Sequence, residues 1–278
     1  MTNLIIQKIS DHGTQHPAFA RLLIQTSELI QWASLSKDER NAIVEIYADK
    51  LKPRLLKCDE ILTRLNMRLH ESCNELASHE QNQVIRVIPH VSGLNSEAEN
   101  FAYEVKNYLR DALGIFRVFF GCELTEARVW YDAKGKGDSE LVKWATQKFG
   151  AHDELTKLLR TEQPWCEEWI RLRNALEHPN DKSGNVIIHN VRPHPDGLIP
   201  PSWSRDGATP TDLFSHMTVA MQNMLTLVED MLILSIGKKK LFAAIEFYEI
   251  PEKERAPEAP QRFTVGLKPE FAKHIKSK

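Results

Sequence analysis

The sequence predicts a mainly α-helical protein with a small β addition near its C-terminus. Apolar side chains recur every three or four residues over most of the chain, which is the period of an amphipathic helix. Two Ser-x-x-Glu capping boxes, which begin at Ser36 and Ser96, mark helix starts. Segments with strand character follow Pro179, where the pattern of the chain changes.

The composition is that of a globular protein of 278 residues, with 42% hydrophobic and 27% charged residues. The 36 basic and 38 acidic side chains give a net charge of −2, so attraction for nucleic acid has to come from a local basic surface. The cysteines form no CxxC pair, and we interpret them as free thiols in a reducing cytoplasm: Cys58, Cys73, Cys122 and Cys166.

Further features predict a soluble, cytoplasmic protein. The stretch Met1–Lys8 lacks the basic start and the apolar run of a signal peptide. The most apolar later segment, Leu213–Ile236, contains three polar side chains that count against a membrane span: His216, Glu229 and Asp230.

The N-terminal part is expected to be helical. A first helix spans Pro17–Ser34, with its apolar side chains on one face. A second begins at the first capping box and spans about Ser36–Leu76, with a kink at Pro53, which has no amide hydrogen to donate. The other capping box opens a third helix over about Ser96–Gly121.

The middle of the chain begins with a glycine- and lysine-rich turn at residues 132–138, which does not match the GxxxxGK[ST] phosphate loop. Helices are predicted over Ser139–Phe149 and Asp153–Arg160. Pro164 is expected to begin a separate helix, because its missing amide is not needed at a first helical position.

The last part combines strands with one long helix. Asn185–Arg192 is predicted to be a strand, followed by a loop rich in proline and glycine through Pro210. A long helix then ends at Gly237, and we interpret its methionine stripe as core packing or a dimer interface. Two further strands, Leu241–Ile250 and Arg262–Leu267, are candidates to pair with the first one in a small sheet.

These elements predict three regions. Residues 1–92 form an N-terminal helical region, and residues 93–240 form a helical domain with a strand and loop insertion. Residues 241–278 form a β-containing tail.

The most unusual surface belongs to the helix that ends before Pro179. At about 100° per residue, its apolar side chains share a stripe that must face the core: Trp165, Trp169, Leu172 and Leu176. The opposite face contains Glu167, Arg171, Asn174 and His178. Arg173 lies about 140° from His178, so the two side chains are not expected to meet on one regular helix.

The pattern Arg173-Asn174-x-x-x-His178 resembles the signature of HEPN domains, compact helical modules many of which are metal-independent ribonucleases. The resemblance covers about Ser96–Ile236. It implies a HEPN-like helical bundle that forms a homodimer, in which two copies of the motif line one cleft.

Two features qualify the match. Arg171 also fits the family spacing of four to six intervening residues, because six residues separate it from His178; Arg173 is favoured because Asn174 matches the fuller pattern. Many family members have a tyrosine two residues after the histidine, where this chain has Asn180.

The chemistry that the resemblance implies is cleavage of RNA without a metal. His178 would exchange a proton with the ribose 2′-hydroxyl or the leaving group, and Arg173 would bind the phosphate. Asn174 would orient the histidine or the phosphate. No cofactor or metal is predicted. The loop residues His189, His194 and Asp196 lack metal-ligand spacing, and no HxxxH or HExxH pair on a helix accompanies them.

Arg192, Trp203 and Arg205 combine basic and aromatic side chains, and we expect them to bind single-stranded RNA beside the cleft. A loop anchored to the core by the tryptophan explains the same residues equally well.

The sequence therefore predicts a metal-independent endoribonuclease with RNA as its substrate. By resemblance only, it would act as a toxin or an antiviral effector, with an antitoxin or another regulatory protein as a partner. The alternative is a non-catalytic helical module that binds nucleotide, RNA or protein.

Overall fold

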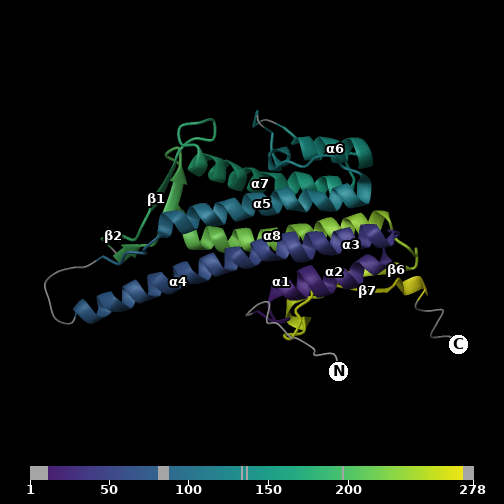
Figure 1. Ribbon diagram of the computed structural model, residues 1–278, viewed down its shortest axis with the longest axis horizontal. Helices are drawn as coiled ribbons and strands as arrows, with labels where there is room; N and C mark the ends of the chain where they lie inside the picture. Colours follow the sequence, from purple (N-terminus) through teal and green to yellow (C-terminus); the bar gives the residue numbers. More distant parts are fainter. Residues whose placement is uncertain (1–11, 81–87, 133, 136, 196, 272–278) are drawn as a thin grey trace, which may run out of the picture.

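Four long helices lie side by side and form the body of the protein (Figure 1). They are α4 (Lys52–Glu80), α5 (Leu94–Phe120), α7 (Glu154–Glu177) and α8 (Leu213–Lys238). The computed structural model describes residues 12–80, 88–132, 134–135, 137–195 and 197–271. The prediction of a mainly helical fold with a small β portion is confirmed.

A helical stretch with changes of hydrogen-bond register precedes α4. It comprises α1 (Pro17–Phe19), the π-helix η1 (Ala20–Gln25), α2 (Thr26–Leu29), the 3₁₀-helix η2 (Ile30–Trp32), α3 (Lys37–Glu45) and the π-helix η3 (Ile46–Leu51). The first predicted helix is thus a succession of short helices.

The Ser36 capping box is confirmed, since the Ser36 amide donates to Glu39 Oε2 (2.7 Å) and the Glu39 amide to Ser36 Oγ (3.2 Å). Helical structure continues past Pro53, and the wider turn of η3 comes just before this proline.

The second predicted capping box is wrong. The helix α5 begins at Leu94, so Ser96 lies inside its first turn. Gly93 takes the N-cap position with a φ of 70°, a left-handed conformation that favours glycine and brings the chain into the helix earlier than expected. The predicted end is confirmed, because Gly121 follows the last helical residue with a φ of 66°.

The helices predicted over Asp153–Arg160 and from Pro164 onward are one continuous helix, α7, with Pro164 inside it. An internal proline costs about 3 kcal/mol through its missing hydrogen bond and its steric clash. Both halves of α7 bury apolar side chains in the same core, among them Leu159 before the proline and Trp169 after it. This burial offsets the cost and keeps the helix intact.

Shorter helices connect α5 to α7. The 3₁₀-helix η4 spans Ala127–Trp130. The helix predicted over Ser139–Phe149 is confirmed as α6 (Glu140–Phe149), with Ser139 as its N-cap. Turns and bends occupy the described part of 132–138, while residues 133 and 136 lie outside the described residues.

The strands form three separate small sheets. One sheet has the antiparallel order β1 (Val186–His189), β4 (Ser202–Arg205) and β5 (Thr211–Asp212); the others pair β2 (Arg192–His194) with β3 (Gly197–Ile199), and β6 (Ile245–Glu249) with β7 (Phe263–Leu267). The predicted strand Asn185–Arg192 is therefore divided, and the expected loop through Pro210 contains strands. The expected pairing of the C-terminal strands with the first strand is wrong, because β6 and β7 pair only with each other among the described strands.

The helix α8 is the central core helix. It contacts α4, α5 and α7, and its methionines Met217, Met224 and Met231 are fully buried. Core packing is thus the correct interpretation of these three methionines, while Met221 of the same stripe is partly buried. By length and composition, α8 is also the one helix of the described chain that is apolar enough to cross a membrane, and 56% of its most apolar window is buried inside the protein.

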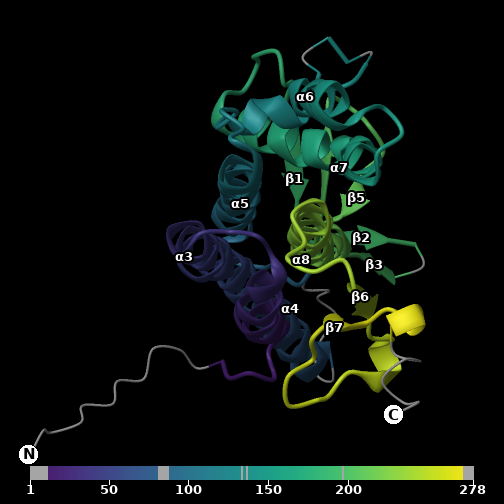
Figure 2. The same cartoon turned by 90° about the vertical axis from the view of Figure 1, so that its right-hand side faces the viewer.

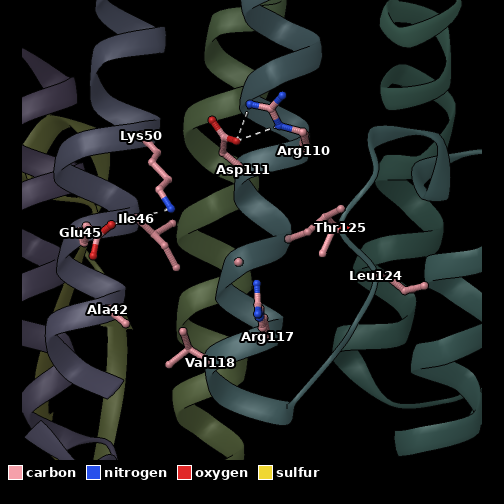
Figure 3. A pocket seen from close by; sticks show the side chains of 12 residues that line it. Ala42, Glu45, Ile46, Lys50, Arg110, Asp111, Arg117, Val118, Leu124 and Thr125 are labelled. Carbon is pink, nitrogen blue, oxygen red and sulfur yellow. Dashed lines mark hydrogen bonds and ion pairs between the residues drawn. The ribbon is translucent and has the colours of Figure 1, made fainter. Parts of the chain in front are cut away.

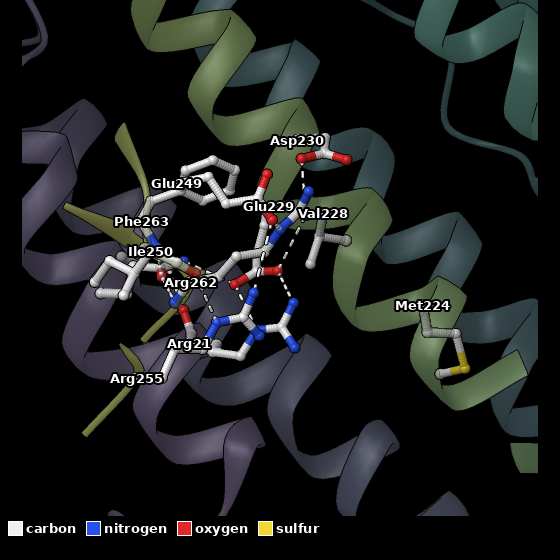
Figure 4. A network of polar contacts seen from close by, with 12 residues as sticks. Arg21, Met224, Val228, Glu229, Asp230, Glu249, Ile250, Arg255, Arg262 and Phe263 are labelled. Carbon is white, nitrogen blue, oxygen red and sulfur yellow. Dashed lines mark hydrogen bonds and ion pairs between the residues drawn. The ribbon is translucent and has the colours of Figure 1, made fainter. Parts of the chain in front are cut away.

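A buried ionic network joins the C-terminal hairpin to the helices (Figure 4). Glu229 of α8 is 1% exposed and accepts hydrogen bonds from Arg21 and from Gln25. The Gln25 side-chain oxygen accepts the backbone amides of Arg262 (2.6 Å) and Phe263 (2.7 Å) at the start of β7. One continuous hydrophobic core runs from Ala18 to Phe263 and includes residues of all three regions expected from the sequence.

Candidate functional site

The Arg173-Asn174-x-x-x-His178 motif lies at the C-terminal end of α7. The predicted inward stripe is confirmed, because Trp169 and Leu172 are buried while Trp165 and Leu176 are partly buried against the core. The Trp169 ring packs against Phe101 of α5, with 5.4 Å between the ring centroids. This packing fixes the rotation of α7, and so determines which side chains remain on its outer face.

Arg173 is held against the surface by two contacts. Its Nη2 lies 2.6 Å from Oε1 of Glu177, one turn further along α7, and its guanidinium lies 5.6 Å from the ring centroid of Tyr103 on α5. The Arg173 side chain is 15% exposed. Burial lowers the pKa of the Arg173 guanidinium, which remains cationic because an arginine side chain is not deprotonated in a protein.

His178 leaves the helix and is open to solvent. It occupies the C-cap position, where its backbone amide donates to the Asn174 carbonyl (2.9 Å) and its φ of −128° is no longer helical. Its side chain is 62% exposed, and Nε2 lies 3.2 Å from Oε2 of Glu177. Glu177 therefore contacts both Arg173 and His178 in one chain, although the two side chains diverge on the helix.

Asn174 is connected to α5. Its carboxamide oxygen accepts a hydrogen bond from Nζ of Lys106 at 2.7 Å. Burial, and then the positive charge of Arg173, lower the pKa of the Lys106 ammonium. The site thus contains two cationic groups, an amide, a carboxylate and an exposed imidazole.

The alternative arginine, Arg171, points to a different neighbourhood. It pairs with Glu167 (2.6 Å), donates to the Asp132 carbonyl (3.5 Å) and lies 5.0 Å from the ring centroid of Tyr131. Arg173 rather than Arg171 shares a contact partner with His178 among the described residues.

Trp203 is unsuited to the predicted stacking with RNA bases. It is 2% exposed, packs against Trp169 with 5.4 Å between the ring centroids, and donates from Nε1 to Nδ1 of His216 at 3.0 Å. The alternative of a loop anchored by its tryptophan is therefore the correct interpretation of this residue.

The two arginines predicted beside Trp203 belong to its β insertion. Arg192 donates to Ser202 Oγ (3.0 Å), and Arg205 lies 3.9 Å from the Asp206 carboxylate. Arg205 also lines a small pocket with Glu168 and His216. Among the described residues, neither arginine forms a hydrogen bond or an ion pair with Arg173, Asn174 or His178.

The two loop histidines weighed as metal ligands lie on different strands. His189 lies in β1 and His194 in β2, while Asp196 is outside the described residues.

A pocket of about 350 Å³ lies along α5 beyond the motif (Figure 3). Its charged lining comprises Glu45, Lys50, Arg110, Asp111 and Arg117. Arg110 comes one helical turn after Lys106 and pairs with Asp111 at 2.9 Å. Basic side chains thus continue along α5 from the motif, with carboxylates beside some of them.

Sequence reasoning missed Lys106, Tyr103 and Glu177 as parts of this site. Glu177 was detectable, because an arginine and a glutamate four residues apart on a helix commonly pair. Lys106 is 68 residues from Asn174, so only the packing of α5 on α7 brings the two together.

Comparisons with protein-family models, with curated proteins and with solved structures found no match to this chain.

Proposed function

We propose that this protein is a HEPN-like, metal-independent endoribonuclease. The observation that carries the proposal is the contact of Glu177 with both Arg173 and His178 on an accessible end of α7. It brings a phosphate-binding cation and a titratable imidazole to one place, beside Asn174 and Lys106. Such groups support phosphodiester cleavage without a metal.

In the proposed reaction, the ribose 2′-oxygen attacks the adjacent phosphorus and the bond from phosphorus to the 5′-oxygen breaks. His178 accepts the proton of the 2′-hydroxyl or supplies one to the leaving 5′-oxygen. Arg173 and Lys106 stabilise the negative charge that accumulates on the phosphate oxygens. The products are a 2′,3′-cyclic phosphate and a 5′-hydroxyl.

Glu177 has a defined part in this scheme. In the free chain its carboxylate occupies the donors of Arg173. An RNA phosphate has to displace the carboxylate from these donors, so Glu177 competes with the substrate for the same cation.

The proposal includes a symmetric homodimer with the motifs near the two-fold axis, so that the second copy supplies a second imidazole and guanidinium to the cleft. Light scattering at micromolar concentration is expected to show dimers. Mixed dimers of wild-type and His178→Ala chains are expected to lose activity. A monomer with undiminished activity would overturn this part of the proposal.

The central experiment is cleavage of single-stranded RNA in excess EDTA. Wild-type protein is expected to leave 2′,3′-cyclic phosphate ends, and His178→Ala and Arg173→Ala are expected to be inactive while remaining folded. The matched control is His152→Ala, which alters an exposed histidine in the turn before α7. Full activity in His178→Ala, or a strict requirement for a divalent metal, would exclude this mechanism.

The second candidate is a non-catalytic module that binds RNA or nucleotide. It is favoured by the separation of the motif side chains in one chain, since Arg173 packs against Tyr103 whereas His178 is 62% exposed to solvent. RNA that binds in an Arg173-dependent manner and remains uncut by purified wild-type protein would support this alternative.

A further inference from the structure

Three side chains with metal-ligating atoms meet at the start of α1. His12 and His16 precede this helix, and Asp59 comes from α4. One ligand atom from each residue lies within 4.8 Å of those of the other two, and all three residues are partly buried. The ring centroids of the two histidines are 4.6 Å apart, and Nε2 of His16 lies 3.5 Å from Oδ2 of Asp59.

We propose that His12, His16 and Asp59 form a binding site for a divalent transition-metal ion, with Zn²⁺ as the best match. Two imidazoles and one carboxylate are a ligand set that Zn²⁺ commonly uses. A tetrahedral ion with bonds of about 2.0–2.1 Å holds its ligand atoms about 3.3–3.4 Å apart. The distance of 3.5 Å between the His16 and Asp59 atoms already approaches this geometry.

The competing role for His16 is to cap α1. Its Nδ1 accepts a hydrogen bond from the Ala18 amide at 3.1 Å. A neutral imidazole that binds a metal through Nε2 has its proton on Nδ1, and can no longer accept from this amide. Metal binding through Nε2 therefore releases the Ala18 amide, which gives the site a specific spectroscopic signature.

The surroundings suit a site with an open coordination position. His16 and Asp59 line a pocket of about 630 Å³ together with Arg21, Arg255 and Arg262. Figure 4 shows these arginines close to one another and to the carboxylates of the buried network. Three protein ligands leave a fourth tetrahedral position for water or for an anionic group in the pocket.

The test is a calorimetric titration of the metal-stripped full-length protein with Zn²⁺ alone. One ion per chain is expected to bind, with affinity reduced at least tenfold in His12→Ala and in Asp59→Asn. His152→Ala and His178→Ala are the controls, and both should bind like the wild type. Absence of binding, or equal affinity in wild type, His12→Ala and Asp59→Asn, would overturn the proposal.

A second measurement on unaltered protein covers the case in which a variant fails to fold. In ¹H–¹⁵N spectra, stoichiometric Zn²⁺ is expected to shift the Ala18 amide and the imidazole resonances of His12 and His16. Unchanged positions of these resonances would contradict the site. This inference does not depend on the proposed ribonuclease activity, because the ligands are distinct from the motif residues and the readouts are binding and chemical shift.

Discussion

Lys106 of α5 donates a hydrogen bond to the carboxamide oxygen of Asn174 in α7, with 2.7 Å between the two atoms. The ammonium group belongs to a different helix, yet it contacts the central residue of the motif on α7, Asn174. Burial lowers the pKa of the Lys106 ammonium, and the nearby positive charge of Arg173 lowers it further. Both cations thus form one basic surface on a chain whose net charge is −2.

Replacing Lys106 with methionine tests this basic surface, because methionine retains an aliphatic side chain and removes the charge. We expect binding of a non-cleavable 2′-deoxy RNA analogue to weaken about tenfold, the effect of losing one charged hydrogen bond. The salt dependence of binding should also become shallower. Lys157→Met, at an exposed lysine near the start of α7, is the matched control and should bind normally. Equal affinities of Lys106→Met and wild type would show that Lys106 does not contribute to RNA binding.

Glu177→Gln distinguishes the two candidate arginines when it is compared with Glu167→Gln. The first change releases Arg173 and the second releases Arg171, since each glutamate pairs with its arginine four residues away on α7. If Arg173 binds phosphate, Glu177→Gln should tighten binding of the same analogue about two- to fivefold, the range expected for a partly exposed ion pair. Glu167→Gln should leave the affinity unchanged. The reverse result would identify Arg171 as the phosphate ligand.

Asp230 should make the stability depend on pH. Burial raises its pKa to about 6 and the Glu229 charge adds to this, although Arg262 opposes the shift. Since the pKa is higher in the folded state than the ordinary value of 3.8 for an aspartate, the folded protein binds the proton more tightly than the unfolded chain does. Protonation of Asp230 thus contributes up to roughly 3 kcal/mol to the free energy of unfolding. This contribution is fully present below about pH 4 and is lost as the pH rises through about 6.

The measurement is urea unfolding between about pH 4 and pH 7 for wild type and Asp230→Asn. The difference in unfolding free energy between the two proteins reports on Asp230 alone, because the other carboxylates are the same in both. We expect the stability of Asp230→Asn relative to wild type to increase with pH across this window. A difference that stays constant with pH would show that the folded-state pKa of Asp230 is normal.

Trp203→Phe tests whether this residue serves the fold or the substrate. The change retains a ring in the core and removes the hydrogen bond to His216. We expect a loss of at least about 1 kcal/mol in unfolding free energy, because the hydrogen bond is lost and the smaller ring leaves a cavity, and an unchanged RNA affinity. Weaker RNA binding with unaltered stability would show that Trp203 stacks with RNA bases and does not serve the fold.

Local sequence patterns determined the helical class and the orientation of α7. The spacing of Trp169 and Leu172 correctly placed the buried face of that helix, because the helical period alone decides which side chains share a face. Ser36 and Glu39 were predictable as a capping box since both partners lie within four residues. The pairing of Arg173 with Glu177 was equally available from local spacing.

Tertiary structure decided what depends on residues that are distant in the sequence. Packing of both halves of α7 in one core outweighed the local signal of Pro164, and the conformation of Gly93 outweighed that of Ser96. The contact of Lys106 with Asn174 likewise required two helices to meet. So did the approach of Asp59 to the histidines before α1. A local pattern specifies the faces that a helix presents, whereas burial of those faces against distant segments determines which polar groups become neighbours.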